Sequence, residues 1–318
     1  MSEKSLWQPT APLENLRRRA SLLADIRRFF SERQVLEMDV PILSRRATSD
    51  PHIDSITANC SGEVAYMATS PEFGLKRLVA AGIGDCYYLG KAFRNGEAGG
   101  RHNPEFSMLE WYRVGWDDHR LMIEVGELLS WVLKIPKVYS HSYRALFLQH
   151  IGVDPHRASF EELRAEVARV LELSFEPAGR DECLDLLMSH HIEPNMGDGI
   201  TLVYDFPATQ AALARVEEDE LGVPVARRFE AYVKGMELAN GYWELTDAPE
   251  QQRRFEADHR YRGDNGKPVY PFEDRLVQAL EAGLPDCAGV ALGFDRLLML
   301  ACGAGRIDEV IAFPIERA

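Results

Sequence analysis

The chain has 318 residues, 46% of them hydrophobic, which is enough to bury a large core. Its 50 acidic and 36 basic side chains give a formal net charge of −14, which argues against non-specific binding to nucleic acid, because such a surface repels a polyanion. The sequence shows no apolar signal core and no run of 18 apolar residues, and its five cysteines are dispersed without a metal-ligand spacing. We therefore expect a cytoplasmic protein with no membrane partner.

The N-terminal part of the chain is expected to alternate helices with strands. Residues 14–34 carry apolar side chains at a spacing of three to four, which predicts an amphipathic helix, and residues 35–41 follow as a short strand. A further helix is expected over 73–82. Residues 86–94 and 104–113 then have the pattern of two antiparallel strands that are joined by a glycine-rich loop.

The remaining pattern predicts an α+β fold. Its strands are connected by hairpins more than by strand–helix–strand crossovers, which favours an antiparallel sheet flanked by helices. Residues 136–200 have a mostly helical pattern and are interpreted as an insertion. The other expected elements are helices at 118–134, 160–173, 180–191, 249–262 and 274–283, strands at 201–206 and 227–239, and a strand that runs directly into a helix at 288–303.

One strand carries a carboxylate in an unusual place. With a period of two residues, Phe106, Met108, Glu110 and Tyr112 share one face of the strand 104–113. A carboxylate in an apolar row is costly to bury unless a cation or a donor meets it. From this feature alone, a structural salt bridge or an exposed sheet face is the preferred interpretation.

Other glutamates have a suggestive spacing. Glu72 stands just before an expected helix, and Glu230, Glu237 and Glu244 are seven residues apart. A hairpin that turns near Lys234-Gly235 would bring Glu230 and Glu237 roughly opposite each other. Such a pair is destabilising unless a cation lies between the two carboxylates, and Mg²⁺ prefers carboxylate oxygens. If the turn lies elsewhere, both side chains are solvated instead.

Three arginines lie at the ends of expected strands beside glycine or asparagine. Arg94 ends one strand, Arg101 lies on the glycine-rich loop, and Arg296 lies where a strand becomes a helix. Arginine binds phosphate or carboxylate oxygens in pairs, and a helix N-terminus favours anions. The three together therefore predict a polyphosphate site. The sequence contains no G-x-x-x-x-G-K-[ST], so this is not a P-loop.

These segments together resemble the catalytic domain of class II aminoacyl-tRNA synthetases, and within it the lysyl-tRNA synthetase branch. The helix 14–34 with the strand after it resembles the first motif of the family, which builds a dimer interface. FRNGEAGGRHNPEFSMLEWY (93–112) resembles the second motif and GVALGFDRLLML (289–300) the third. TSPE, RHNPEF and ELANGYWELTD resemble lysine-type signatures. The resemblance covers 15–318 and implies a class II synthetase fold, a single catalytic domain after an N-terminal extension of residues 1–14, and a homodimer.

Two features point to one branch of this family. Because 14 residues precede the first motif, we expect no anticodon-binding domain of the kind that lysyl-tRNA synthetases carry. This form is similar to the elongation factor P–lysine lysyltransferases, which modify a lysine of a translation factor instead of charging tRNA. Ala291 stands where the tRNA-charging enzymes have glycine, a change that accompanies a preference for (R)-β-lysine over α-lysine. The resemblance thus implies lysine or β-lysine as substrate, elongation factor P as acceptor, and no role for tRNA.

The resemblance also implies roles for individual residues. Arg94 and Arg296 would act as catalytic residues that hold the phosphates of ATP, with Arg94 also on the substrate carboxylate. The remaining ATP-binding residues would be Asn95, Gly96, Glu97, Arg101, Asn103, Phe106, Glu237, Leu238 and Gly293, and the Mg²⁺ ligands would be Glu230 and Glu237. The substrate-binding residues would be Ser70, Pro71, Glu72, Glu110, Tyr112, Tyr242, Glu244 and Ala291.

These roles agree with the chemistry of the substrate. Lysine and β-lysine each carry two ammonium groups separated by methylenes, so a selective pocket needs carboxylates at two ends and an apolar wall between them. By the resemblance, Glu72 would take the amino group near the carboxylate, and Glu110 and Glu244 would take the distal ammonium. A neutral amino acid would leave these carboxylates unpaired, which gives strong rejection.

One position departs from the family pattern. The second motif normally has a glutamate two residues after its arginine, but here Gly96 stands at that position and Glu97 follows. Either the loop shifts by one residue so that Glu97 serves, or the adenine amino group loses a contact. We favour the shift, because glycines make it conformationally inexpensive.

Two alternatives stay open. One is a minimal lysyl-tRNA synthetase-like adenylating enzyme, against which the net charge and the expected absence of an anticodon-binding domain argue. The other is a non-catalytic paralogue that binds lysine or a nucleotide, against which the complete set of arginines and glutamates argues. An acidic protein acceptor would need a basic patch, for which Lys76, Arg77 and residues 253–262 are candidates.

Overall fold

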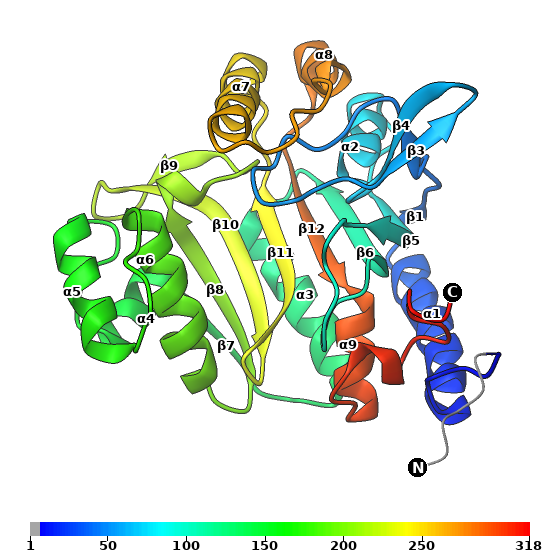
Figure 1. Ribbon diagram of the computed structural model, residues 1–318, viewed down its shortest axis with the longest axis horizontal. Coiled ribbons are helices and arrows are strands. Elements are labelled where there is room, and N and C mark those ends of the chain that lie inside the picture. Colours follow the sequence, from blue (N-terminus) through cyan, green and yellow to red (C-terminus); the bar gives the residue numbers. More distant parts are fainter. Residues whose placement is uncertain (1–6) are drawn as a thin grey trace. The chain divides into compact units, whose positions relative to one another are not determined.

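The computed structural model describes residues 7–318, which form two compact units (Figure 1). Unit 1 comprises the residues up to Gly115 together with Thr246–Cys287 and Ala291–Ala318, and unit 2 comprises Trp116–Leu245 and Ala288–Val290. Residues 1–6 of the expected N-terminal extension lie outside the described residues. No helix of the described part is long and apolar enough to span a bilayer.

Unit 1 begins with a helix and a hairpin that the sequence predicted. The elements are α1 (Leu13–Glu32), β1 (Leu36–Glu37), α2 (Glu72–Ala80), β5 (Cys86–Phe93) and β6 (Glu105–Val114). β5 and β6 are antiparallel, with Tyr88 opposite Glu110, while β1 pairs with β5 in parallel. Phe30 of α1 is fully buried, and it stacks on Tyr87 at 4.5 Å and meets the edge of Trp111 at 5.3 Å. The apolar spacing of the helix thus fixes α1 on this hairpin.

A small sheet in unit 1 was not predicted. Its strands are β2 (Leu43–Ser44), β3 (Thr57–Cys60) and β4 (Glu63–Met67), in the order β2-β4-β3. The strands are short, and most of their side chains are exposed or half-buried, so the sequence shows no alternation between a buried and an exposed face.

The C-terminal elements of unit 1 match the predicted pattern. They are α7 (Ala248–Asp264), α8 (Asp274–Gly283), β12 (Cys287–Gly293), α9 (Phe294–Cys302) and the short 3₁₀ helix η4 (Ile307–Glu309). Ala288–Val290 of β12 group with unit 2. α9 starts directly where β12 ends and packs against α1 and β6.

Unit 2 is built from a sheet and a group of helices. β8 pairs with β10, and β10 with β11 and β9, in antiparallel fashion, while β7 pairs with β8 in parallel. The elements are α3 (Asp118–Leu133), β7 (Val138–Ser142), α4 (Tyr143–His150), α5 (Phe160–Val170), α6 (Arg180–Leu187), η1 (Met188–Ile192), η2 (Glu193–Asn195), β8 (Ile200–Pro207), η3 (Ala208–Gln210), β9 (Val216–Glu218), β10 (Pro224–Val233) and β11 (Met236–Trp243). Figure 1 shows α4, α5 and α6 gathered beside β8, where Phe147, Cys183 and Val203 share one core.

The fold class is α+β, as predicted, but the strands are mixed rather than purely antiparallel. β1 pairs with β5 in parallel, and β7 pairs with β8 in parallel. β1 has two residues, and Val138 and Tyr139 of β7 are about half exposed, so neither strand has a strong buried pattern. Residues 136–200 therefore contain a sheet strand as well as helices.

The predicted turn at Lys234-Gly235 is confirmed, but the predicted register is wrong. Lys234 and Gly235 have φ angles of +53° and +66° and connect β10 to β11 as a tight hairpin. The two-residue turn pairs Val233 with Met236 and therefore places Glu237 opposite Tyr232. Beyond it, the pairing shifts by one residue between Ala231 and Tyr232, and Glu230 lies opposite Asn240. The position of the turn itself excludes a direct cross-strand pairing of the two glutamates.

Candidate active site

Glu110 of unit 1 is a buried carboxylate with two hydroxyl partners. It is 1% exposed. Ser70 Oγ donates to its Oε2 at 2.6 Å, and Tyr112 Oη donates to its Oε1 at 2.9 Å. Tyr112 lies two residues further along β6, which confirms the predicted common face. From the strand pattern alone, a salt bridge or an exposed face was preferred for Glu110. The exposed face is wrong, because the side chain is buried, and the two hydrogen-bond partners of the carboxylate are hydroxyl groups.

The surroundings of Glu110 favour its protonated form when no cation is bound. Burial, followed by the neighbouring charge of Glu72, raises the pKa of Glu110 to about 8. Glu72 begins α2, where its N–H donates to Ser70 Oγ at 3.0 Å. Its Oε1 accepts from the buried ammonium of Lys76 at 2.6 Å. Pro71 is the N-cap residue of the helix, and Ser70 before it contacts both the Glu110 carboxylate and the backbone N–H of Glu72.

Arg94 lies just beyond the end of β5 and has few strong side-chain contacts. Its guanidinium lies 5.1 Å from the ring centroid of Phe106, and Nη1 is 3.5 Å from Glu97 Oε1. Its Nε is buried without a hydrogen-bond partner among the described residues. A buried donor of this kind is costly, so Arg94 is suited to bind an anion that enters from outside the chain.

The loop after Arg94 explains the departure from the family pattern. Gly96 has a φ of +77°, a left-handed backbone that glycine adopts readily and a glutamate does not. Glu97 is the residue that meets Arg94, which agrees with the predicted one-residue shift, although its contact with adenine stays a prediction. Asn95 and Arg101 are exposed on the same loop.

Two residues of the second motif hold their neighbours in place. Asn103 is 7% exposed, and its Nδ2 donates to Glu105 O at 2.6 Å while its Oδ1 accepts from Ile315 N at 3.1 Å. His102 Nε2 accepts from Arg296 Nη2 at 2.6 Å. Burial, and then Arg296, lower the pKa of His102, so the imidazole is neutral and can accept this bond.

The third motif brings Arg296 to the start of a helix. Gly293 is the N-cap residue of α9, and Arg296 lies in the first turn. Ala291 is half-buried on β12, two residues before that cap. These three positions belong to unit 1, as do the residues of the second motif and Ser70, Pro71 and Glu72.

Asp295 supports this motif, and the sequence analysis did not single it out. It is 2% exposed, its Oδ1 accepts from Arg19 Nη1 at 2.5 Å, and its Oδ2 accepts from Ser107 N at 2.6 Å. Arg19 also donates to Ser107 Oγ at 2.5 Å. Asp295 thus joins α9 to α1 and β6, and it fixes Arg296 beside the second motif. A polar residue inside the apolar run GFDRLLML was the available signal.

Replacing Asp295 by asparagine should destabilise unit 1. The change removes the negative charge that accepts these two hydrogen bonds, and it leaves the guanidinium of Arg19 without its charged partner. Together, the two losses should lower the unfolding free energy by about 2 kcal/mol. Urea unfolding of the full chain measures this. Asp308→Asn, which affects an ion pair with Arg306 at the surface, should change the unfolding free energy by less than about 0.5 kcal/mol. Equal effects of the two variants would contradict the anchoring role of Asp295.

The remaining predicted residues belong to unit 2. Glu230 is 7% exposed, and both of its carboxylate oxygens accept hydrogen bonds, Oε1 from Arg228 Nη2 and Oε2 from Tyr232 Oη. Arg228 also donates to Asn240 Oδ1 at 3.1 Å. Glu230 is therefore neutralised by a neighbour on its own strand, which makes it a poor ligand for a metal ion.

The other predicted residues of unit 2 lie on β11 or just after it. Leu238 is 2% exposed and Glu244 is fully buried, while Glu237 and Tyr242 are half-buried. The backbone carbonyl of Glu244 accepts two hydrogen bonds from the guanidinium of Arg215. The strand β11 fixes the spacing of these side chains. That they serve the same substrate as Glu110 and Arg94 stays a prediction.

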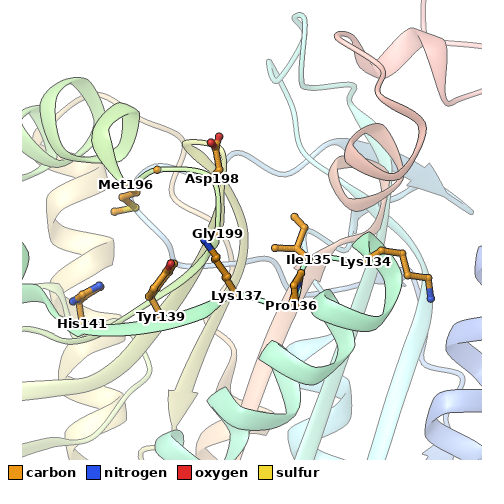
Figure 2. Close-up of a pocket in the computed structure, with 10 residues that line it drawn as sticks. Lys134, Ile135, Pro136, Lys137, Tyr139, His141, Met196, Asp198 and Gly199 are labelled. Carbon is orange, nitrogen blue, oxygen red and sulfur yellow. The ribbon is translucent and has the colours of Figure 1, made fainter.

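Unit 2 also has a pocket and an acidic cluster that contain no predicted residue. The pocket, of about 640 Å³, is lined by Lys134, Ile135, Pro136, Lys137, Tyr139, His141, Met196, Gly197, Asp198 and Gly199. Figure 2 shows these side chains along the loop after α3, the strand β7 and the loop before β8. The cluster consists of Asp118, His119 and Asp205. Arg227 donates to both of its carboxylates, at 2.9 and 3.0 Å, and thus supplies the positive charge there.

The basic patch proposed for an acidic partner is only partly available. Lys76 is 2% exposed and pairs with Glu72, and Arg262 is fully buried. Neither side chain can meet a partner protein. Arg77, Arg253 and Arg260 are exposed and remain candidates.

Comparison with known proteins places the chain in a family. The family tRNA synthetases class II (D, K and N) matches residues 8–317. Proteins named Elongation factor P--(R)-beta-lysine ligase from Yersinia enterocolitica serotype O:8 / biotype 1B and from Klebsiella pneumoniae strain 342 are each 48% identical to the chain, and the alignments cover all of both sequences. The same holds for a protein of that name from Klebsiella pneumoniae subsp. pneumoniae. The chain therefore belongs to the class II tRNA synthetases of the D, K and N type.

Proposed function

We propose that the chain activates lysine, preferably (R)-β-lysine, with ATP as an aminoacyl-adenylate and transfers it to a lysine side chain of elongation factor P. The name of the relatives supports the substrate and the acceptor. The observation that carries the proposal is one face of β6. Phe106 with Arg94 lies at one end, and buried Glu110 lies four residues further, about 13 Å along the strand. An anion site and an ammonium site at this separation suit an adenylate of a long cationic amino acid.

The first half-reaction needs charge neutralisation more than proton transfer. A carboxylate oxygen of the amino acid attacks the α-phosphorus of ATP, the bond from that phosphorus to the bridging oxygen breaks, and pyrophosphate leaves. The attacking carboxylate is already ionised at neutral pH, so no general base is required. Arg94 and Arg296 would hold the phosphates and stabilise the charge that develops on them.

The second half-reaction forms an amide. The neutral ε-amine of the acceptor lysine attacks the adenylate carbonyl, the carbon–oxygen bond to the phosphate breaks, AMP leaves, and the nitrogen loses a proton. The chain would contribute by holding the adenylate at both ends, with Glu110 on the distal ammonium. This arrangement keeps the carbonyl in one place for the incoming amine.

The residues fit ATP better than they fit the predicted Mg²⁺ pair. The buried Nε of Arg94 and the helix start beside Arg296 offer donors for phosphate oxygens. Glu230 does not fit a metal site, because Arg228 and Tyr232 already occupy its oxygens. Of the two predicted glutamates, we retain only Glu237 as a ligand for the Mg²⁺ that accompanies ATP. The charge of this ion would offset that of the phosphates.

We also propose that the chain acts as a homodimer without tRNA. Exposed apolar side chains at the ends of α1 and β1 and on the small sheet support a dimer interface, among them Leu13, Leu36 and Leu43. Light scattering on the purified chain tests the oligomeric state. A monomer at micromolar concentration would contradict the dimer.

Ala291 is proposed to set the choice between the two forms of lysine. Replacing Ala291 by glycine removes a methyl group, and a change of this size in a pocket is worth about tenfold in kcat/KM. We expect the ratio of kcat/KM for α-lysine over (R)-β-lysine to rise by that factor in ATP–pyrophosphate exchange. Ala288→Gly, a buried change earlier on the same strand, is the control. An unchanged ratio in Ala291→Gly would remove this residue from the proposal.

The proposed function is tested in two steps. ATP–pyrophosphate exchange is measured with α-lysine and with (R)-β-lysine, and transfer is then measured to purified elongation factor P and to tRNA. Exchange with transfer to the protein is the expected result. No exchange with either amino acid would exclude both enzyme functions, and transfer to tRNA alone would establish the minimal synthetase instead.

A further inference from the structure

Arg262 is an arginine of unit 1 that neither the family motifs nor the proposed reaction uses. It lies in the last turn of α7 and is fully buried. Its guanidinium donates to three backbone carbonyl oxygens, Pro268 O at 2.6 Å, Asp50 O at 2.6 Å and Ile53 O at 3.0 Å. It also pairs with the carboxylate of Asp54. A fully buried guanidinium is costly, and here it is satisfied mainly by backbone atoms of other segments.

The segment 50–55 depends on these contacts for its shape. It has no helix or strand of its own. Tyr270, whose ring centroid lies 4.7 Å from the Arg262 guanidinium, accepts from Ser55 N at 3.2 Å and donates to Asp54 Oδ1 at 3.4 Å. Lys267 donates to Pro51 O at 2.6 Å. Because this segment lacks a backbone ladder, α7 and the loop after it supply most of the partners that fix it.

The same segment contacts the backbone beside Arg94. Asn95 N donates to Asp54 O at 2.8 Å, and Arg94 N donates to Pro104 O at 2.9 Å. The Arg94 side chain has only weak contacts of its own, so its position is set chiefly by these two backbone bonds. One bond belongs to the hairpin, and the other leads through Asp54 to Arg262.

We infer that Arg262 is a positioning residue for Arg94, acting through Asp54 and the Asn95 amide. The inference deepens the proposed function and rests on it for the kinetic part of its test. Without Arg262, the segment 50–55 would lose its central partner, and Asn95 would lose a fixed acceptor. Arg94 would then sample positions away from the reacting phosphorus, where a misplacement of about 1 Å costs on the order of a hundredfold in rate.

The kinetic test compares Arg262→Met with Arg260→Met. Arg260 is exposed on the same helix, so the control makes the same chemical change two residues away. In ATP–pyrophosphate exchange, normalised to the sites that form adenylate in a single turnover, we expect kcat of R262M to fall about ten- to a hundredfold. The KM for lysine, which depends on the Glu110 end, should change by less than about twofold. Full activity of R262M, or an equal loss in R260M, would overturn the inference.

A double-variant cycle separates positioning from a general loss of stability. Adding R262M to Arg94→Lys should lower kcat by less than about twofold beyond R94K alone, because both changes act on the same interaction. Multiplying effects would show that Arg262 acts independently of Arg94, and would overturn the inference. If R262M does not fold, Arg262→Lys takes its place, since lysine keeps a cation for Asp54 but cannot reach the three carbonyls together.

Hydrogen exchange gives a readout that does not need catalysis. The Asn95 amide should lose its protection in R262M, while the Arg94 amide, which is bonded inside the hairpin, should keep it. Protection of Asn95 equal to that in the unmodified chain would contradict the inference. If the unmodified chain forms no adenylate, the proposed function fails, and this measurement still decides whether Arg262 holds the Asn95 amide through Asp54.

Discussion

Arg94→Met should lower adenylate formation by about a thousandfold, the largest effect that we expect from a single change at the anion end of the site. The guanidinium is always charged, and it lies beside Phe106 with a buried Nε that has no partner among the described residues. Methionine keeps an unbranched apolar stem and removes the guanidinium with every donor. The loss should fall mainly on kcat, because the charge on the α-phosphate oxygens grows as the carboxylate attacks.

ATP–pyrophosphate exchange and equilibrium binding of ATP measure this prediction together. Binding of ATP should weaken by less than about tenfold in R94M, because other donors also hold the nucleotide before the reaction. Arg157→Met, which changes an exposed arginine of unit 2, should leave both quantities as they are. A loss of ATP binding as large as the loss of kcat would show that Arg94 only holds the nucleotide.

Glu110→Gln should weaken use of lysine by about a thousandfold in kcat/KM while ATP binding is retained. Separating a buried ammonium from its carboxylate costs about 3–5 kcal/mol. The amide has nearly the same shape, but it cannot neutralise an ammonium, and its NH₂ group would face a donor from Ser70 or Tyr112. Glu105→Gln, on an exposed position of the same strand, is the matched control. Equal losses for lysine and ATP would place Glu110 outside the amino acid pocket.

The pH dependence of kcat/KM for lysine follows from the same residue. The pKa of Glu110 is raised to about 8 by burial and by Glu72, so in the empty site the carboxyl group is mostly protonated at pH 7. An ammonium binds the ionised form, and the side-chain ammonium of lysine stays charged up to about pH 10. We therefore expect kcat/KM to rise about tenfold per pH unit below pH 8 and to level off above it. The rise should be absent in E110Q, and an equal rise there would assign it to another group.

The functional hairpin could be predicted from sequence because its signals are local. Alternation along 104–113 and the glycine-rich loop place β5, β6 and the face of Glu110, and the structure confirms them. α1 was predicted from its apolar spacing for the same reason. The third motif could be placed because β12 runs directly into α9.

The partners of these residues could not be predicted, because they come from distant parts of the chain. Ser70 meets Glu110 across 40 residues, and Arg262 meets Asp54 across 208. The Glu230–Glu237 pairing was wrong because it depends on the turn to within one residue: the pair Val233–Met236 closes the turn and places Glu237 opposite Tyr232. The bulge between Ala231 and Tyr232 then moves the partner of Glu230 one residue further, to Asn240. Asp295 is a polar residue in an apolar helix, and its partners Arg19 and Ser107 lie 276 and 188 residues away in the chain.

The backbone at Gly96 also bears on how sequences of this kind can diverge. A glutamate introduced there by point mutation would enter a left-handed conformation that its Cβ disfavours, so the change is penalised before any contact with a ligand is gained. A loop with glutamate two residues after the arginine and a loop with Gly96-Glu97 are therefore separated by a rearrangement of the chain path. Exchange between the two forms during evolution would require coupled substitutions or a change in loop length, which would make this short segment a stable marker of descent.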